Sequence, residues 1–354
     1  MLRHGNGTGG WNNGGYEAVV TGPQANVRHP FRDIRLHIVT GKGGTGKTTV
    51  AGALALALAS DGRRVLLVEA EGRQGIAQLF DSPPLPYEER KIASAPGGGE
   101  VFALAIDPEE ALLDYLEMFY NLKRAGRVLK RFGVVDFATT VAPGMRDVLI
   151  TGKIKEAVVR TGAKGRLAYD AVVLDAPPTG RITRFLNVTT EVAVLARMGP
   201  VKGQADSVVR VIRSPQTAVH LVTILEEMPV QETVDGVAEL GDSDIPVGAV
   251  VVNMSRDPLL DDEALDQARE NTLDPAELAA GLKASGLDAT DTLTGLLAAE
   301  AADHANRVAL ERRERQELAE LGPPVYELPL LPEAIELGAL YRLAEMLREQ
   351  GMAG

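Results

Sequence analysis

A short stretch near the start of the chain has the residue types and the spacing of a phosphate-binding loop. Residues 41–49 read Gly-Lys-Gly-Gly-Thr-Gly-Lys-Thr-Thr, between an apolar run at 36–40 and a helix-like run at 50–59. Glycines tolerate positive φ and let backbone N–H groups approach a phosphate closely. A strand, a glycine-rich loop and a helix in this order are what such a loop requires. The stretch is therefore interpreted as the cradle of a nucleotide phosphate.

The side chains of this loop predict a nucleoside triphosphate bound with Mg²⁺. Lys47 is placed to meet the β- and γ-phosphates, and the Thr48 hydroxyl completes the coordination of a Mg²⁺ that bridges them. The helix that begins here adds the positive end of its dipole. The residues expected to contact the nucleotide are Gly41, Gly43, Gly44, Thr45, Gly46, Lys47, Thr48 and Thr49.

A carboxylate for the same metal is predicted at Asp175. It follows the apolar run 171–174, which places it at the carboxyl end of a buried strand. Ligands gather at that end in open α/β sheets. Because nucleotide hydrolysis requires a carboxylate near Mg²⁺, Asp175 is expected to hold the ion through water, beside Thr48.

Two segments resemble one family of P-loop ATPases. Lys42 makes the loop a "deviant" Walker A, Lys-Gly-Gly-x-Gly-Lys-Thr, and residues 175–186 read Asp-Ala-Pro-Pro-Thr-Gly-Arg-Ile-Thr-Arg-Phe-Leu. The latter is similar to the signature Asp-Thr-Ala-Pro-Thr-Gly-His-Thr-Leu-Arg-Phe-Leu of the arsenite-pump ATPase (ArsA) family, which includes chaperone ATPases that deliver tail-anchored membrane proteins. The resemblance implies that 175–186 is a switch sensing the γ-phosphate. It also implies that Lys42 reaches the nucleotide site of a partner, in a homodimer or a heterodimer with a paralogue.

The resemblance also locates a first switch, where this chain departs from the family. The family usually reads Asp-Pro-Ala-His-Asn, and its Asp orients the attacking water, whereas residues 71–75 here read Glu-Gly-Arg-Gln-Gly. Glu71 takes the Asp position, and its extra methylene displaces the carboxylate by roughly an ångström, which matters in near-attack geometry. The catalytic residues are thus predicted to be Lys42, Lys47 and Glu71, with slow hydrolysis.

Recognition of the base is predicted at the ends of the late strands. Asn253 follows the apolar run 247–252 and resembles a strand-ending asparagine of the family, whose amide can donate to and accept from adenine. Met-Ser-Arg follows instead of the Asn-Lys-x-Asp typical of guanine readers, which favours ATP over GTP. Pro332 resembles a residue packing beside the base. As structural alternatives, Asn253 caps a turn and Pro332 ends a strand.

The composition excludes several classes of protein. The chain has 354 residues with 45% hydrophobic and 24% charged content, typical of a globular protein. It has no cysteine, which excludes disulfides and thiolate metal sites, and its five histidines show no ligand-like spacing. A net charge of −12 disfavours bulk nucleic-acid binding. With neither a membrane span nor a secretory signal recognised, the expected location is cytoplasmic.

Apolar runs that alternate with helical patterns must position these residues. Such runs, at 36–40, 65–68, 101–106, 171–174, 218–224, 247–252 and 325–328, indicate a mostly parallel sheet with helices on both faces. The fold class is therefore α/β, a P-loop NTPase with an appended helical layer. Residues 1–33 are interpreted as a flexible Gly/Asn-rich arm. Residues 34–354 are interpreted as a single P-loop ATPase domain, in which the helical segments 107–150 and 258–321 form a subdomain.

The function predicted is an ATP-binding, Mg²⁺-dependent ATPase that acts as a dimeric switch and serves anion transport at a membrane partner. Arsenite is disfavoured as the anion, because the family's metalloid site uses thiolates. The alternative is a targeting chaperone that shelters an apolar membrane-protein segment in a groove lined by residues 112–122, with Met118, Phe119 and Tyr120. Packing of the same residues in the core is the structural alternative. A partitioning or positioning ATPase ranks last, because the chain is acidic and its C-terminal segment is mixed in charge.

Overall fold

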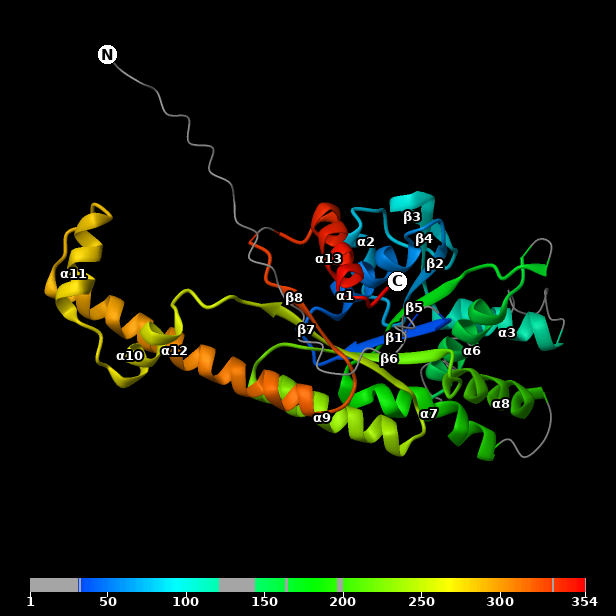
Figure 1. The fold of residues 1–354 in the computed structure, drawn as a ribbon. Coiled ribbons are helices and arrows are strands. Elements are labelled where there is room, and N and C mark those ends of the chain that lie inside the picture. Colours follow the sequence, from blue (N-terminus) through cyan, green and yellow to red (C-terminus); the bar gives the residue numbers. More distant parts are fainter. Residues whose placement is uncertain are drawn as a thin grey trace, which may run out of the picture.

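An eight-stranded sheet runs through the molecule (Figure 1), and the seven predicted apolar runs form seven of its strands. The computed structural model describes residue 31 and residues 33–120, 144–162, 165–195, 200–332 and 334–353. The strands are β1 (Leu36–Gly41), β2 (Arg64–Glu69), β3 (Arg90–Ala95), β4 (Gly99–Ala105), β5 (Ala171–Asp175), β6 (Thr217–Thr223), β7 (Val247–Ser255) and β8 (Val325–Pro329). Their order is β3-β4-β2-β5-β1-β6-β7-β8, and every neighbouring pair is parallel except β3 with β4. The predicted α/β class is confirmed.

Helices cover both faces of this sheet. The described helices are α1 (Lys47–Ala59), α2 (Gly75–Leu79), α3 (Pro108–Tyr120), α6 (Met145–Val159), α7 (Thr179–Leu195), α8 (Pro200–Ile212), α9 (Glu227–Asp242), α10 (Asp262–Glu270), α11 (Pro275–Ala284), α12 (Asp291–Glu320) and α13 (Leu337–Glu349). The first and last of them, α1 and α13, lie on one face, and α6 to α9 lie on the other (Figure 1). A parallel sheet needs this cover because its strands are apolar on both sides.

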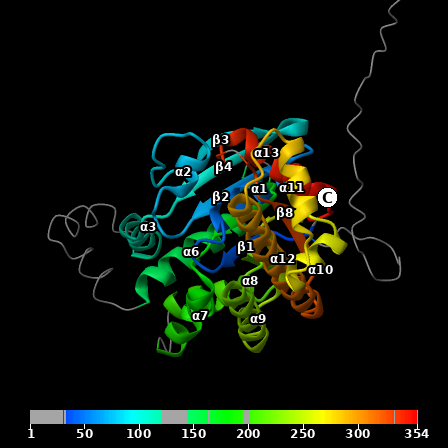
Figure 2. The same cartoon turned by 90° about the vertical axis from the view of Figure 1, so that its left-hand side faces the viewer.

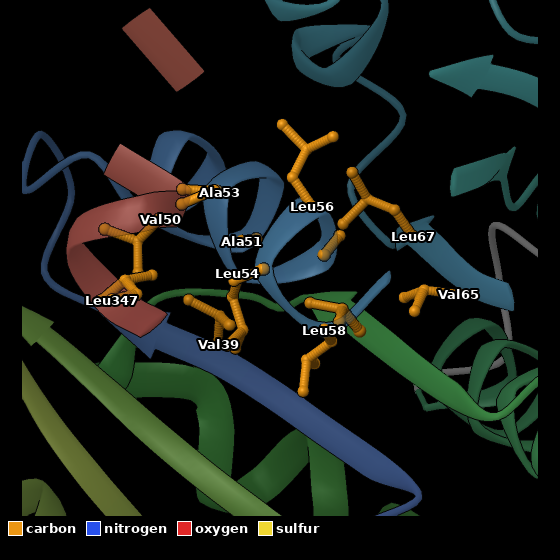
Figure 3. Close-up of a cluster of buried hydrophobic side chains, with 14 of the residues drawn as sticks. Val39, Val50, Ala51, Ala53, Leu54, Leu56, Leu58, Val65, Leu67 and Leu347 are labelled. Atoms are coloured by element: carbon orange, nitrogen blue, oxygen red, sulfur yellow. The ribbon is translucent and has the colours of Figure 1, made fainter. Parts of the chain in front are cut away.

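The helix that follows the glycine-rich loop is buried all round. Every residue from Val50 to Ala59 is buried, because α1 is packed between the sheet, α2 and α13. Figure 3 shows its leucines between Val39 of β1, Leu67 of β2 and Leu347 of α13. A helix that is apolar on all faces belongs in such a core. This packing holds the start of α1, and with it the loop, against the sheet.

One strand was not predicted. Residues 90–95 read Arg-Lys-Ile-Ala-Ser-Ala and form β3, the antiparallel edge of the sheet. Only Ala93 and Ala95 are buried in it, so the apolar signal is weak. Edge strands tolerate exposed charged residues, which also discourage pairing with other chains.

A long helical arm projects from the body. The 30-residue helix α12 packs against α9 and carries α10 and α11 at its far end (Figures 1 and 2). These helices connect β7 to β8, where the helical segment 258–321 was predicted. Asp274 caps α11 by accepting a hydrogen bond from the N–H of Ala276 at 2.8 Å. Within the described ranges, no helix combines the length and apolarity needed to cross a bilayer.

Other predicted segments are described only in part. Of the helical segment 107–150, α3 and the start of α6 are seen, and residues 121–143 lie outside the described residues. The side chains of Met118, Phe119 and Tyr120 also lie outside them. The same holds for residues 1–30 and 32 of the predicted arm. Phe31, at the end of that arm, is 5% exposed and packs in the core.

Two histidines form a buried pair in the middle of the sheet. Nδ1 of His37 on β1 lies 3.0 Å from Nε2 of His220 on β6, and both rings are fully buried. The ring of Phe31 meets His220 edge-on, with centroids 5.1 Å apart. Gly248 makes room, since a Cβ there would lie 2.7 Å from the His220 ring. The pair has a structural role in the core.

We expect this pair to make the fold acid-sensitive. Burial lowers the pKa of His220 to about 3, and burial together with His220 holds the pKa of His37 well below its ordinary value. Below pH 6.5 these two histidines bind protons in the unfolded chain but stay neutral in the folded protein. The free energy of unfolding therefore falls as the pH decreases from 6.5 towards 3. For His220 alone this amounts to about 2 kcal/mol between pH 7.5 and pH 5.

Urea unfolding at the two pH values measures this loss. The variant His37→Gln/His220→Gln should show a smaller difference in unfolding free energy between them than the wild type. Equal pH dependence in both proteins would contradict the assignment.

Candidate active site

The sheet order brings the predicted site residues to one edge. Strand β1 lies between β5 and β6, and β5 lies beside β2. The loops after β1, β2 and β5 therefore meet at the carboxyl edge of the sheet, where ligands bind in such folds. Lys47 begins α1 after the first of these loops, Glu71 lies in the loop after β2, and Asp175 is the last residue of β5.

The backbone of the loop has the form that its glycines predict. Gly44 and Gly46 have φ of +91° and +85°. A Cβ on Gly41 would lie 2.1 Å from the carbonyl oxygen of Val222, and one on Gly46 would lie 2.2 Å from Nδ2 of Asn253. Gly46 precedes α1 and no side chain caps that helix, so its first N–H groups are available to an anion.

Lys47 and Thr45 are both folded against the loop. The Lys47 ammonium donates to the carbonyl oxygen of Lys42 at 3.3 Å, and the Thr45 hydroxyl donates to the same oxygen at 2.9 Å. Burial lowers the pKa of Lys47, while the nearby carboxylates of Asp175 and Glu71 act in the opposite direction. The lysine is thus a partly desolvated cation inside the loop, suited to a phosphate. Thr49 is half-buried in the first turn of α1, and Gly43 is exposed.

The two predicted metal residues are in contact. The Thr48 hydroxyl donates to Oδ2 of Asp175 at 2.7 Å. Glu69, at the end of β2, is in register with Asp175, and its Oε1 is buried without a hydrogen-bond partner among the described residues. A hydroxyl and two carboxylates form the all-oxygen environment that Mg²⁺ prefers. The residues present therefore fit the ion, with Thr48 and Asp175 placed to hold it.

The pKa of the Asp175 carboxyl is set mainly by its burial. Burial raises the pKa of Asp175 to about 6, although the hydrogen bond from Thr48 and the charge of Lys47 oppose the shift. Glu69 and Glu71 raise it further. Two neighbouring carboxylates that repel each other in a desolvated site favour a bound cation.

Lys42 is linked within this chain to residues 175–186, the segment that the family resemblance predicts to be a switch and that is called the second switch below. Its ammonium lies 2.8 Å from Oε1 of Glu232 on α9, and Oε2 of Glu232 accepts a hydrogen bond from the Thr179 hydroxyl at 3.2 Å. One carboxylate therefore joins the lysine of the loop to the first residue of α7. The end of β1 is joined to residues 175–186 as well, because the Thr40 hydroxyl donates to the carbonyl oxygen of Pro177 at 2.7 Å.

Glu71 lies between two arginines. Its carboxylate is 3.6 Å from Arg73 and 3.8 Å from Arg181 of the second switch. Arg181 also approaches Asp147 of α6 at 3.9 Å. The predicted water-orienting carboxylate is therefore connected to the second switch through Arg181, which stands where the family signature has histidine.

The two residues predicted to contact the base lie in different surroundings. Asn253 is 5% exposed, and its Nδ2 donates to the carbonyl oxygen of Thr45 at 2.9 Å, so it holds the glycine-rich loop. Pro332 is exposed, shortly after β8. Contact of either residue with adenine stays a prediction.

Sequence reasoning missed two acidic members of the site. Glu69 could have been suspected, because a carboxylate ends the apolar strand β2. Glu232 carries no such signal, since it is one of several acidic residues on α9. It is remote from Lys42 in the sequence, although the two side chains are in contact in the structure. Its role depends on the packing of α9 against the sheet.

Comparison with known proteins agrees with this geometry. A family model described as "Anion-transporting ATPase" matches residues 34–214. ATPase BagA of Mycobacterium tuberculosis is 54% identical over 337 residues, 95% of this chain and 99% of that protein. ATPase GET3 of Podospora anserina is 29% identical over 155 residues, 44% of this chain and 43% of its own. An arsenical pump-driving ATPase of Escherichia coli is 32% identical over 149 residues, 42% and 24% of the two chains.

Proposed function

This chain belongs to the anion-transporting ATPase (ArsA) family and is an ATPase, and from that premise we propose that it is a Mg²⁺-dependent dimeric switch that serves anion transport at a membrane partner. ATP binding at the loop drives the switch, and hydrolysis resets it. The two chains of the dimer are identical or paralogous.

The observation that carries the proposal is the link from Lys42 through Glu232 to Thr179. A nucleotide-driven switch needs a connection between the phosphate site and the segment that moves. Here one carboxylate contacts both the loop lysine and the start of α7. The γ-phosphate of the ATP bound to the partner chain competes with Glu232 for Lys42, and its arrival therefore changes what holds residues 175–186 of this chain.

The remaining residues supply the parts that phosphoryl transfer requires. Lys47 and the N–H groups of the loop bind the phosphates, and Glu71 orients the attacking water. Mg²⁺, when bound, neutralises charge that develops on the phosphate oxygens. Thr48 and Asp175, whose side-chain oxygens lie 2.7 Å apart, would hold the ion.

Anion transport is proposed over the chaperone because the matching family model is described as anion-transporting. Of the groove residues 112–122, the side chains from residue 115 onward lie outside the described ones, and Leu112 packs against the core, so no observation favours that alternative. The positioning ATPase is disfavoured, because its membrane-bound form would need an exposed amphipathic C-terminal helix. In this chain Leu340, Leu343 and Leu347 of α13 are buried against the core.

Replacing Lys42 by alanine is expected to leave ATP binding within about threefold of wild type and to slow hydrolysis about 100-fold. This is less than the roughly 10³–10⁵-fold contribution of an arginine supplied in trans, because lysine is a point charge that lacks the bidentate fork of arginine. The physical reason is that Lys42 pairs with Glu232 in its own chain and acts on ATP across the dimer. Nucleotide titration and hydrolysis rates at increasing protein concentration measure the two effects.

Two further variants separate the trans role from the internal ion pair. Glu232→Gln removes the ion pair and keeps a partner for the Thr179 hydroxyl, so hydrolysis should persist. Lys91→Ala, which removes a lysine paired with Glu100 at 2.8 Å on the far edge of the sheet, should behave as wild type. Full hydrolysis by Lys42→Ala would exclude the trans role.

Capture of partners tests the transport role. The full chain carries a tag and is used to capture partners from extracts of its own cells, in the presence of ATP or of ADP. An integral membrane transporter should be retained with one of the two nucleotides only. Recovery of apolar single-span segments instead would support the chaperone, and stimulation of hydrolysis by DNA would support the positioning ATPase.

A further inference from the structure

A polar cavity of about 230 Å³ lies beside the two switches, outside the phosphate loop. Its charged lining comes from three elements: Glu71 and Arg73 from the loop after β2, Arg146 and Asp147 from α6, and Arg181 from α7. No residue of 41–49 lines it, and neither does Asp175. We call this space the switch cavity.

The arginines of the switch cavity are only loosely engaged. The ion pairs of Arg73 and Arg181 span 3.6–3.9 Å, longer than the roughly 2.7–2.9 Å of a strong charge-assisted hydrogen bond. Toward the residues that the structure describes, Arg146 forms no ion pair. Guanidinium donors that are not saturated by carboxylates remain able to bind another oxygen ligand.

The local charge favours an anion. Three guanidinium groups face two carboxylates, and Glu71 and Asp147 are largely covered, with side chains 22% and 18% exposed. Arg146 and Asp147 lie in the first turn of the 15-residue helix α6, at the positive end of its dipole. Planar guanidinium groups match the oxygens of phosphate-like and carboxylate ions.

We propose that the switch cavity binds a small tetrahedral oxyanion, held by the guanidinium groups of Arg73, Arg146 and Arg181. The volume is below the roughly 300–1,000 Å³ of sites for drug-sized ligands, which limits the occupant to a small ion with water. The ion is either free in solution or the phosphate released by hydrolysis, and both have the same chemistry.

Binding there acts on hydrolysis through Glu71. The oxyanion competes with Glu71 for Arg73 and Arg181, so it removes the two cations beside that carboxylate. Glu71 is then free to orient water, and the rate of ATP hydrolysis rises. This second step rests on the role of Glu71 in the proposed function, whereas binding of the ion does not.

Sulfate is the probe, because it is tetrahedral and is not a product of the reaction. Equilibrium dialysis of radiolabelled sulfate against the full-length Lys47→Ala protein, without nucleotide and at ionic strength fixed with chloride, avoids binding in the phosphate loop. One saturable site is expected. Adding Arg146→Gln should weaken it about tenfold, as loss of one charged hydrogen bond does.

Arg184→Gln is the matched control. Arg184 lies on α7 within electrostatic reach of Asp147 but does not line the switch cavity, so sulfate affinity should change less than about twofold. Thermal unfolding of each variant confirms folding. Absence of saturable binding, or equal losses in Arg146→Gln and Arg184→Gln, would overturn the site.

Hydrolysis tests the coupling. With Lys47 intact, sulfate should stimulate ATP hydrolysis in the wild type, and not in Arg146→Gln. Sulfate binding without stimulation would overturn the coupling and leave the binding site supported. A chain that binds sulfate but hydrolyses no ATP, alone or mixed with a paralogue, would instead contradict the proposed function.

Discussion

Replacing Lys47 by alanine is expected to weaken ATP binding about 100-fold, through the loss of roughly 3 kcal/mol of charge-assisted contact with the phosphates. Lys47 is a partly buried cation that donates only to the carbonyl oxygen of Lys42 within its loop, at 3.3 Å. Its removal also takes away the positive charge that acts on Asp175, whereas Glu71 keeps Arg73 and Arg181 beside it. Titration with a fluorescent ATP analogue measures the affinity.

The neighbouring lysine provides the comparison. Lys42→Ala removes the same charge from the same loop, yet is expected to keep ATP binding. Similar affinity loss in both variants would show that general positive charge, and not the position of Lys47, binds the phosphates.

Replacing Asp175 by asparagine is expected to reduce Mg²⁺-dependent hydrolysis by about 100-fold or more, because the carboxylate that holds the ion is lost. The hydrogen bond from Thr48 survives, since the asparagine oxygen can accept it, so the fold should remain intact. Binding of ATP without Mg²⁺ should not weaken, because a negative charge near the phosphates disappears. Hydrolysis rates over a Mg²⁺ titration measure the effect.

Asp170→Asn is the matched control for this change. Asp170 precedes the other end of β5, where its carboxylate accepts a hydrogen bond from the N–H of Arg64 at 2.8 Å, far from the phosphate loop. Wild-type Mg²⁺ dependence is expected. Retained Mg²⁺ dependence in Asp175→Asn would mean that other groups, with Glu69 the first to test, hold the ion.

Most of the fold was predictable because buried parallel strands have a local signal. The runs that became β1, β2, β5 and β7 are rich in Val, Ile and Leu, as expected of strands that are covered on both faces. The strand β3 lacks that signal, because one side of an edge strand faces water. The order of strands in the sheet was not predictable, since it depends on how distant segments pack.

The residues of the candidate site also fall into a group that the sequence predicts and a group that it does not. The phosphate loop was predictable because its glycines, Lys47 and Thr48 are adjacent in sequence, and Asp175 because it ends a buried strand. The contacts of Glu232, Arg181 and Asn253 were not, because each joins residues far apart in the chain. The interpretation of Asn253 considered a turn cap and the adenine base, whereas the structure shows it bound to the loop itself.

The sequence by itself predicted the phosphate loop, the carboxylate proposed to hold a metal and the mostly parallel sheet, because each depends on neighbouring residues and their backbone preferences. Only the tertiary structure decided what surrounds them. It placed β5 between β1 and β2, which brings Asp175 to Thr48 and beside Glu69. It also packed α6, α7 and α9 so that Lys42 meets Glu232 and the arginines of both switches meet around Glu71. These contacts depend on charge and distance between remote segments, which local sequence does not encode.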